Sequence, residues 1–123
     1  MPDVLIFVPR KLEEQVQEMM SKLGLALREA TAIALKDVQP HQVAVMAISF
    51  FASDNATSMQ ILGIASASPT RLEKLETWRD ELAKAWVAFS KDKGIPWKAD
   101  VDAWSTMPAG KWIPATPEAL EGL

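Results

Sequence analysis

The sequence predicts an α+β domain in which two β-α-β units form a four-stranded mixed sheet with two helices on one face. Two observations lead to this class. Apolar runs of strand length and two long stretches of helical periodicity follow one another in the order strand, helix, strand, strand, helix, strand. Crossovers of the usual right hand then place both helices on the same face. With 123 residues, 49% of them apolar, the chain fits a single domain over residues 1–123.

The first unit opens with a β-branched apolar run, Val4–Val8, which Pro9 stops. This length and composition favour a buried strand. A helix is predicted next, because apolar residues recur at three- and four-residue spacing from Leu12 to Ala34, and Lys36 is expected in its last turn. Gly24 lies inside this pattern and weakens it by about 1 kcal/mol relative to Ala, so a bend or break there is an open alternative.

Two further strands are predicted after Pro40, at Val43–Phe51 and Met59–Ala67. Residues 53–57 between them carry turn chemistry, so we expect an antiparallel hairpin. Both strands are apolar on both faces. The sheet face away from the helices must therefore also be buried, and oligomerisation is the expected way to bury it.

The second helix begins where Ser68 provides an N-cap and Pro69 occupies the first helical position. Trp78 and Trp86 lie in its apolar stripe and are expected in the core, and Gly94 marks the end of the helix.

The C-terminal part is expected to hold a short strand at Lys98–Trp104 and an irregular Pro-rich tail over residues 105–123. Trp97, Trp104 and Trp112 lie outside strong periodicity. They are better candidates for a pocket or an interface than for the core.

Composition excludes several kinds of chemistry. The chain has no Cys and a single His, His41, so thiol nucleophiles are excluded and a zinc site is not expected. The five glycines form no phosphate-binding loop. A net charge of −3 argues against nucleic-acid binding, and the longest apolar runs are too short to span a membrane. We expect a cytoplasmic protein that uses no cofactor and no metal.

Pro2 is the remaining candidate for proton transfer. It directly precedes the first buried strand, and a small second residue normally permits removal of Met1. The exposed group is then a secondary amine. An apolar surround lowers the pKa of such an amine by disfavouring its charged form, which makes it a general base near neutral pH. If Met1 is retained, the Pro2 nitrogen is an amide and cannot act as a base.

These residues resemble the tautomerase superfamily, in particular members similar to macrophage migration inhibitory factor and to the cis-3-chloroacrylic acid dehalogenases. The resemblance rests on Met1-Pro2, on the strand end Val8-Pro9-Arg10, on the doubled β-α-β order and on the tail from Ala103 to Trp112. It implies a homotrimer with a pocket at each subunit boundary. It also implies keto–enol tautomerisation or isomerisation of a small unsaturated keto or hydroxy acid, with Pro2 as general base and acid.

The resemblance implies further site residues. Lys36 or Arg10 would hold the substrate carboxylate, Ile64 would line the pocket, and Trp104 would close it, together with Trp112. Each residue also has a simpler interpretation. Lys36 is a cation at a helix end, Arg10 flanks a helix start, and Ile64 is a strand core residue.

Two departures narrow the activity. The paired arginines of the dehalogenase-like members have no counterpart after the third strand, where Ser66, Ser68 and Pro69 stand, so dehalogenation is not expected. The chain has no Tyr, so water or an indole N–H has to polarise the substrate oxygen. Two alternatives stay open: a catalytically silent member that binds a small acid or a protein partner, and an unrelated small α+β oligomer.

Overall fold

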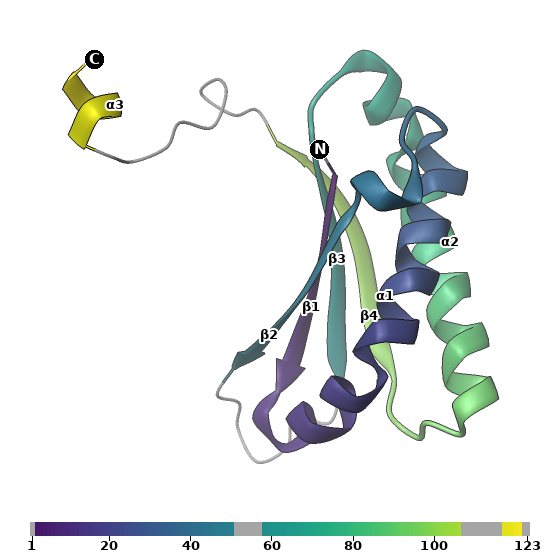
Figure 1. Cartoon of the computed structure of the whole chain (residues 1–123). Helices are drawn as coiled ribbons and strands as arrows, with labels where there is room; N and C mark the ends of the chain where they lie inside the picture. Colours follow the sequence, from purple (N-terminus) through teal and green to yellow (C-terminus); the bar gives the residue numbers. More distant parts are fainter. Residues whose placement is uncertain (1, 51–57, 107–116, 122–123) are drawn as a thin grey trace.

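The computed structural model describes residues 2–50, 58–106 and 117–121, in which one sheet of four strands carries two long helices on one face (Figure 1). The elements in chain order are β1 (Asp3–Pro9), η1 (Arg10–Leu12), α1 (Glu13–Leu35), η2 (Pro40–Gln42), β2 (Ala44–Phe50), β3 (Met59–Ser66), α2 (Pro69–Lys93), β4 (Ala99–Thr106) and α3 (Pro117–Glu121). The predicted class and the predicted order of strands and helices are confirmed.

The strand order is β2-β1-β3-β4. β1 pairs in parallel with β2, β3 pairs in parallel with β4, and the two units join through an antiparallel pairing of β1 with β3. The expected hairpin between β2 and β3 is therefore wrong, because β1 lies between them. Each crossover closes its own parallel pair, so the strands that open the two units meet at the centre of the sheet.

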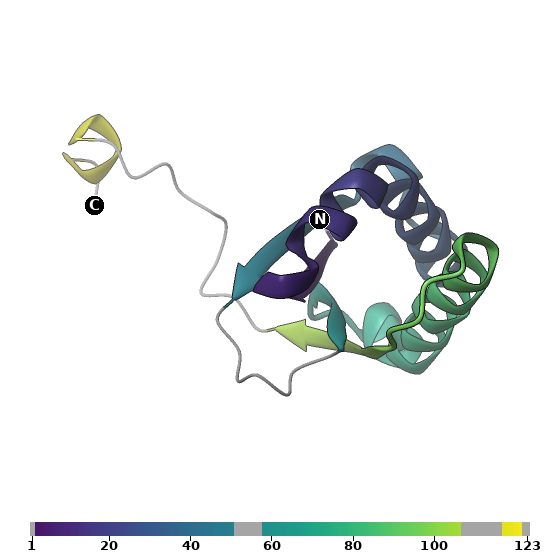
Figure 2. The same ribbon diagram turned by 90° about the horizontal axis from the view of Figure 1, so that it is seen from below.

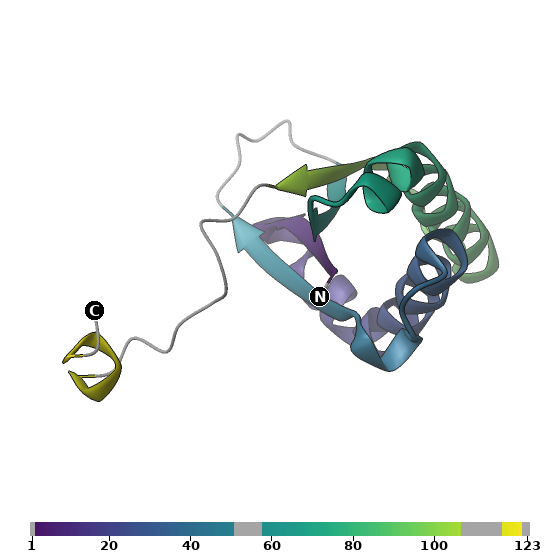
Figure 3. The ribbon, with the colours of Figure 1, turned by 90° about the horizontal axis from the view of Figure 1, so that it is seen from above.

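Both helices cover the same face of the sheet. Views from below and from above show α1 and α2 side by side on one side of the strands (Figures 2 and 3). Neither helix has an 18-residue stretch apolar enough to cross a bilayer, and this holds for every helix in the described part of the chain.

The core lies between the sheet and the helices. Trp78 of α2 is fully buried at its centre, and its indole Nε1 donates a hydrogen bond to Thr31 Oγ1 of α1 at 2.9 Å. Thr31 Oγ1 in turn donates to the Leu27 carbonyl at 2.8 Å. The indole packs on Gly63 of β3, where an added Cβ would come within 2.7 Å of the ring. Trp86 is also buried, as predicted.

The helix ends differ in how well they were predicted. Ser68 caps α2 as expected, its hydroxyl accepting a hydrogen bond from the Arg71 backbone N–H at 3.1 Å, and Gly94 ends the helix with a φ of 65°. α1 runs through Gly24 without a break. It stops at Leu35, so Lys36 is not in the last turn. Lys36 is the C-cap residue, with a left-handed φ of 64°.

The tail differs from its prediction in two ways. β4 continues to Thr106, two residues into the expected irregular segment, because its backbone keeps pairing with β3 up to Ser66. Residues from Pro117 to Glu121 form a short helix, in which proline supplies a helical φ at the first position and Glu118 lies in the first turn. Trp112 lies outside the described residues.

The sheet face away from the helices carries exposed apolar side chains. Met46 and Ile48 on β2 are 46% and 42% exposed, and Trp104 on β4 is 54% exposed. A cavity of about 500 Å³ lies on this outer face against β1, β3 and β4. A single copy of the chain therefore leaves open the face that the sequence predicts to be buried.

Candidate active site at the Pro2 end of the sheet

Pro2 is fully buried at the start of β1. The neighbouring Asp3 pairs with Ala44 on one side and with Ile64 on the other. Continuing the β3 register by one residue sets Pro2 opposite Ala65, which is itself buried. The residue-2 nitrogen thus lies at the buried end of an apolar strand.

Several chain segments meet at this end of the molecule. The N-terminus of β1, the C-terminus of α1, η2 and the first turn of α2 are grouped at the top of Figure 1, where β2 begins and where β3 and β4 end. Residues that are far apart in the sequence therefore lie at the same end of the molecule as Pro2.

Ile64 and Trp104 are register partners on β3 and β4, and they lie next to one another on the outer sheet face at the Pro2 end. By strand alternation Pro2 faces the helices with Val4, whereas Ile64 and Trp104 face the opposite side. The structure thus brings all three residues to one edge of the sheet but on two different faces.

The Trp104 indole is held by its own strand. Its Nε1 donates a hydrogen bond to Asp102 Oδ2 at 2.8 Å, and the Ala103 backbone N–H donates to Asp102 Oδ1 at 2.8 Å. These two hydrogen bonds hold the pKa of the Asp102 carboxyl below its usual range, and the bond from the indole has the larger effect. The pair gives Trp104 a fixed orientation on an exposed surface.

The two candidate anchors for a carboxylate lie at opposite ends of β1. Lys36 is exposed and directly follows α1, at the Pro2 end. Arg10 directly follows β1 at its other end, and the strand between them has a length on the order of 20 Å. Within one chain, Lys36 therefore lies at the Pro2 end of the sheet and Arg10 lies at the opposite end.

Solved structures with a similar fold identify this architecture. A fused 4-OT in an asymmetric trimer superposes with a TM-score of 0.63 at 14% identity, covering 98% of this chain and 99% of that one. 5-Carboxymethyl-2-hydroxymuconate delta-isomerase gives a TM-score of 0.56 at 12% identity, covering 98% and 91%. MIF2 from Leishmania major gives 0.51 at 19% identity, covering 90% and 93%.

The chain has the tautomerase-superfamily fold. Comparison with family models and with curated protein sequences finds no match. The likeness is therefore one of architecture, and the roles of individual residues in this tautomerase fold rest on their own geometry.

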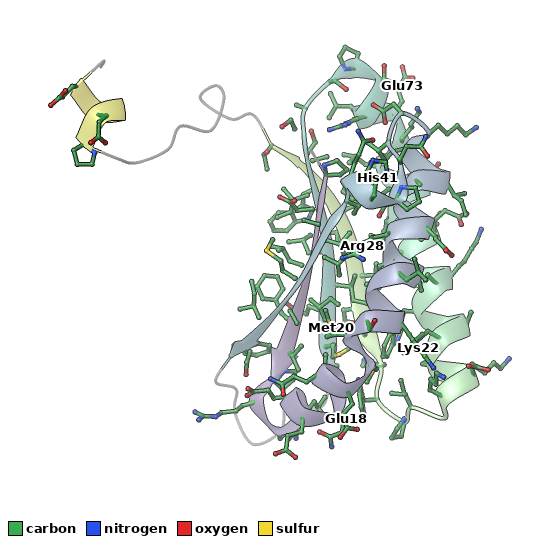
Figure 4. The ribbon with its side chains drawn as sticks, viewed as in Figure 1. Glu18, Met20, Lys22, Arg28, His41 and Glu73 are labelled. Atoms are coloured by element: carbon green, nitrogen blue, oxygen red, sulfur yellow. The ribbon has the colours of Figure 1, made fainter. Side chains whose placement is uncertain are left out.

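Three basic residues at the Pro2 end were not singled out by the sequence. Arg28 of α1 is half-buried, and its Nε donates to the Val43 carbonyl at 3.2 Å; Figure 4 shows its side chain beside β2. Lys74 of α2 donates from Nζ to the Leu35 carbonyl at 2.8 Å. Arg71 Nη2 lies 3.6 Å from Asp37 Oδ2. All three occupy polar flanks of amphipathic helices, where nothing in the spacing distinguishes them from solvated charges.

A buried hydroxyl lies on the same edge. Ser105 pairs with Ala65, and its Oγ is buried without a hydrogen-bond partner among the described residues. Buried polar atoms are normally paired, so this hydroxyl is an exception at the Pro2 end of the sheet. Within the described ranges, no group of three His, Asp or Glu side chains is placed to hold a metal ion.

Proposed function

We propose that this protein is a keto–enol tautomerase or isomerase that acts on a small unsaturated keto or hydroxy acid. The observation that carries the proposal is the fully buried Pro2 at the start of β1 in a tautomerase-superfamily fold. The sequence offers no Cys, no Tyr and one His, which leaves the N-terminal amine as the group suited to move a proton at neutral pH.

The proposed reaction moves one proton and releases nothing. After Met1 is removed, the Pro2 nitrogen carries a lone pair that accepts the proton of the substrate enol hydroxyl. The same nitrogen returns a proton to the carbon at the other end of the enol double bond, and the carbonyl forms. Burial supports this role, because an apolar surround disfavours the protonated amine. The neutral amine therefore forms more easily, and the protonated amine gives up its proton more readily.

The substrate carboxylate is assigned to Lys36, whose side chain has no partner among the described residues. Ile64 and Trp104 supply apolar surface at the same edge of the sheet. Arg10 is assigned to the pocket of a neighbouring copy, since it lies at the far end of β1 from its own Pro2.

We further propose that the active form is a homotrimer. Met46, Ile48 and Trp104 leave a largely apolar outer sheet face open to solvent, and a fused 4-OT of similar fold forms a trimer. Sedimentation should give three times the mass of 13.6 kDa. Met46→Asp should lower that mass, because a carboxylate would be buried without a partner, whereas Glu29→Asp on the exposed side of α1 should leave it unchanged.

The decisive experiment combines intact mass with turnover. The purified protein should be lighter than its sequence by one Met and should ketonise phenylenolpyruvate or 2-hydroxymuconate. Pro2→Ala should lose most of this activity, because a primary amine replaces the ring nitrogen, while Pro96→Ala in an exposed loop should keep it. Full activity in Pro2→Ala would end the proposal. Retained Met1 together with no turnover would favour the silent member that binds a small acid or a partner.

A further inference from the structure

The end of α1 is built in an unusual way. Among the described residues, Lys36 is the one non-glycine residue with a positive φ, at 64°. α2 ends with the same left-handed turn, but there the residue is Gly94, with a φ of 65°. Glycine adopts this conformation without steric cost, and a residue with a Cβ does not. The left-handed residue that ends the helix of the second unit is therefore less strained than Lys36, which ends the helix of the first unit.

The residues on both sides of Lys36 are tied to α2. Lys74 Nζ donates to the carbonyl of Leu35 at 2.8 Å, and Arg71 Nη2 lies 3.6 Å from Asp37 Oδ2. The Arg71 side chain is only 16% exposed, so this ion pair is partly shielded from water. The Lys36 backbone N–H is also used, as it donates to the Ala32 carbonyl at 3.0 Å.

The two ties hold the chain on both sides of Lys36. The carbonyl of the residue before Lys36 and the side chain of the residue after it are both bound to α2. The left-handed backbone of Lys36 therefore has little freedom to move. Lys74 and Arg71 use their own cations in these contacts, whereas the exposed Lys36 ammonium has no partner in the described part of the chain. Strain of this kind persists where the surrounding structure enforces it, and it collects at functional sites.

We propose that Lys74 and Arg71 are positioning residues that hold the strained Lys36 turn so that its ammonium selects an anionic ligand at the Pro2 end. That the ligand is a small keto acid rests on the proposed function. α2 thereby takes a role in substrate selection that is separate from the proton transfer at Pro2.

The first test separates the charge of Lys36 from its backbone strain. Lys36→Gly should raise the thermal midpoint by about 2–4 °C, because it removes the strain, and raise KM for phenylenolpyruvate by about 10- to 100-fold with kcat little changed. Lys36→Ala should raise KM equally without the gain in midpoint, and Lys36→Arg should restore KM. Lys22→Ala is the control, since Lys22 lies nearer the start of α1, and the helical rise per residue puts it about 20 Å from Lys36.

The second test addresses the positioning residues. Lys74→Met and Arg71→Gln should each raise KM by about 3- to 10-fold, because a displaced ammonium binds the carboxylate less well. In a Lys36→Gly background, the same two changes should leave KM unaltered. A merely structural role for Lys74 and Arg71 would raise KM equally in both backgrounds and would overturn the assignment.

Binding of phenylpyruvate, measured by calorimetry on the same variants, keeps this proposal separate from the proposed function. If the protein binds phenylpyruvate but does not ketonise its enol, the proposed function fails while the Kd series still decides the role of Lys36. If Pro2→Ala loses turnover but Lys36→Gly keeps both KM and Kd, the proposed function stands and the present inference is overturned. If the unaltered protein neither binds nor turns over, both are wrong.

Discussion

Replacing Gly63 with alanine would put a methyl group into the indole ring of Trp78. The added Cβ would lie 2.7 Å from Trp78 Cζ2 and 2.9 Å from Cε2 and Cη2. Carbon atoms in contact normally stay at least about 3.5 Å apart, so the ring would have to shift by about 0.8 Å. Trp78 is fully buried, and its Nε1 hydrogen bond to Thr31 Oγ1 fixes it from the other side.

The expected cost follows from these contacts. Overpacking of a core costs about 1–3 kcal/mol, and weakening the buried Trp78 hydrogen bond adds about 1 kcal/mol. Gly63→Ala should therefore lower the free energy of unfolding by about 2–4 kcal/mol, a large part of the stability of an ordinary domain. The thermal midpoint, followed by far-UV circular dichroism at fixed protein concentration, should fall by roughly 6–15 °C.

Gly24→Ala is the matched control. Gly24 is also buried, but its added Cβ would lie 4.0 Å from Val45 Cβ, which is ordinary contact, and alanine favours the helix by about 1 kcal/mol. This variant should be at least as stable as the unaltered protein. If Gly63→Ala is equally stable, the packing of Trp78 against β3 described above is incorrect.

Three further substitutions address local features. Ser68→Ala removes the acceptor for the Arg71 backbone N–H and should lower the free energy of unfolding by about 1 kcal/mol, measured by urea denaturation. Gly94→Ala has free space around its added Cβ but a φ of 65°, so it should lower the thermal midpoint purely through backbone strain. The depressed pKa of Asp102 means that its ionised form contributes stability above about pH 4, which is lost as the pH falls through the folded-state pKa. In an NMR titration, Trp104→Phe should move that pKa upward, and an unchanged value would show that the indole is not its main cause.

The positions of the strands and helices could be predicted from the sequence because each element carries its own period. Met59, Ile61 and Ala65 lie at alternating positions of the predicted third strand, and all three are buried on one face of β3. Ser68 and Gly94 have side chains suited to the two ends of α2, and they occupy those ends.

The pairing of strands could not be predicted in the same way. Alternation reveals which side chains share a face, but it does not reveal which strand lies alongside, so β2 and β3 were expected to pair and β1 was not expected between them. The outer face of β2, with Met46 and Ile48, is exposed in the single chain, whereas the sequence pattern required its burial.

The candidate site was predicted in part. Pro2, Lys36, Ile64 and Trp104 come to one end of the sheet, because β1 begins there and α1, β3 and β4 end there. Arg10 does not, since a strand separates it from Pro2. The ties from α2 to the Lys36 turn were beyond prediction, because they join residues 39 and 34 positions apart and a lysine gives no signal of a left-handed turn.

The hydrogen bond between Trp78 and Thr31 crosses from the second β-α-β unit to the first. The side chain that fills the centre of the core thus belongs to one half of the sequence, and its polar atom is satisfied by the other. Residues 2–50 taken alone would lack the indole that fills the core, and residues 58–106 alone would lack the Thr31 hydroxyl that accepts the indole N–H. The two halves of the chain are therefore cooperative, and unfolding should follow a single transition in which neither half survives the other.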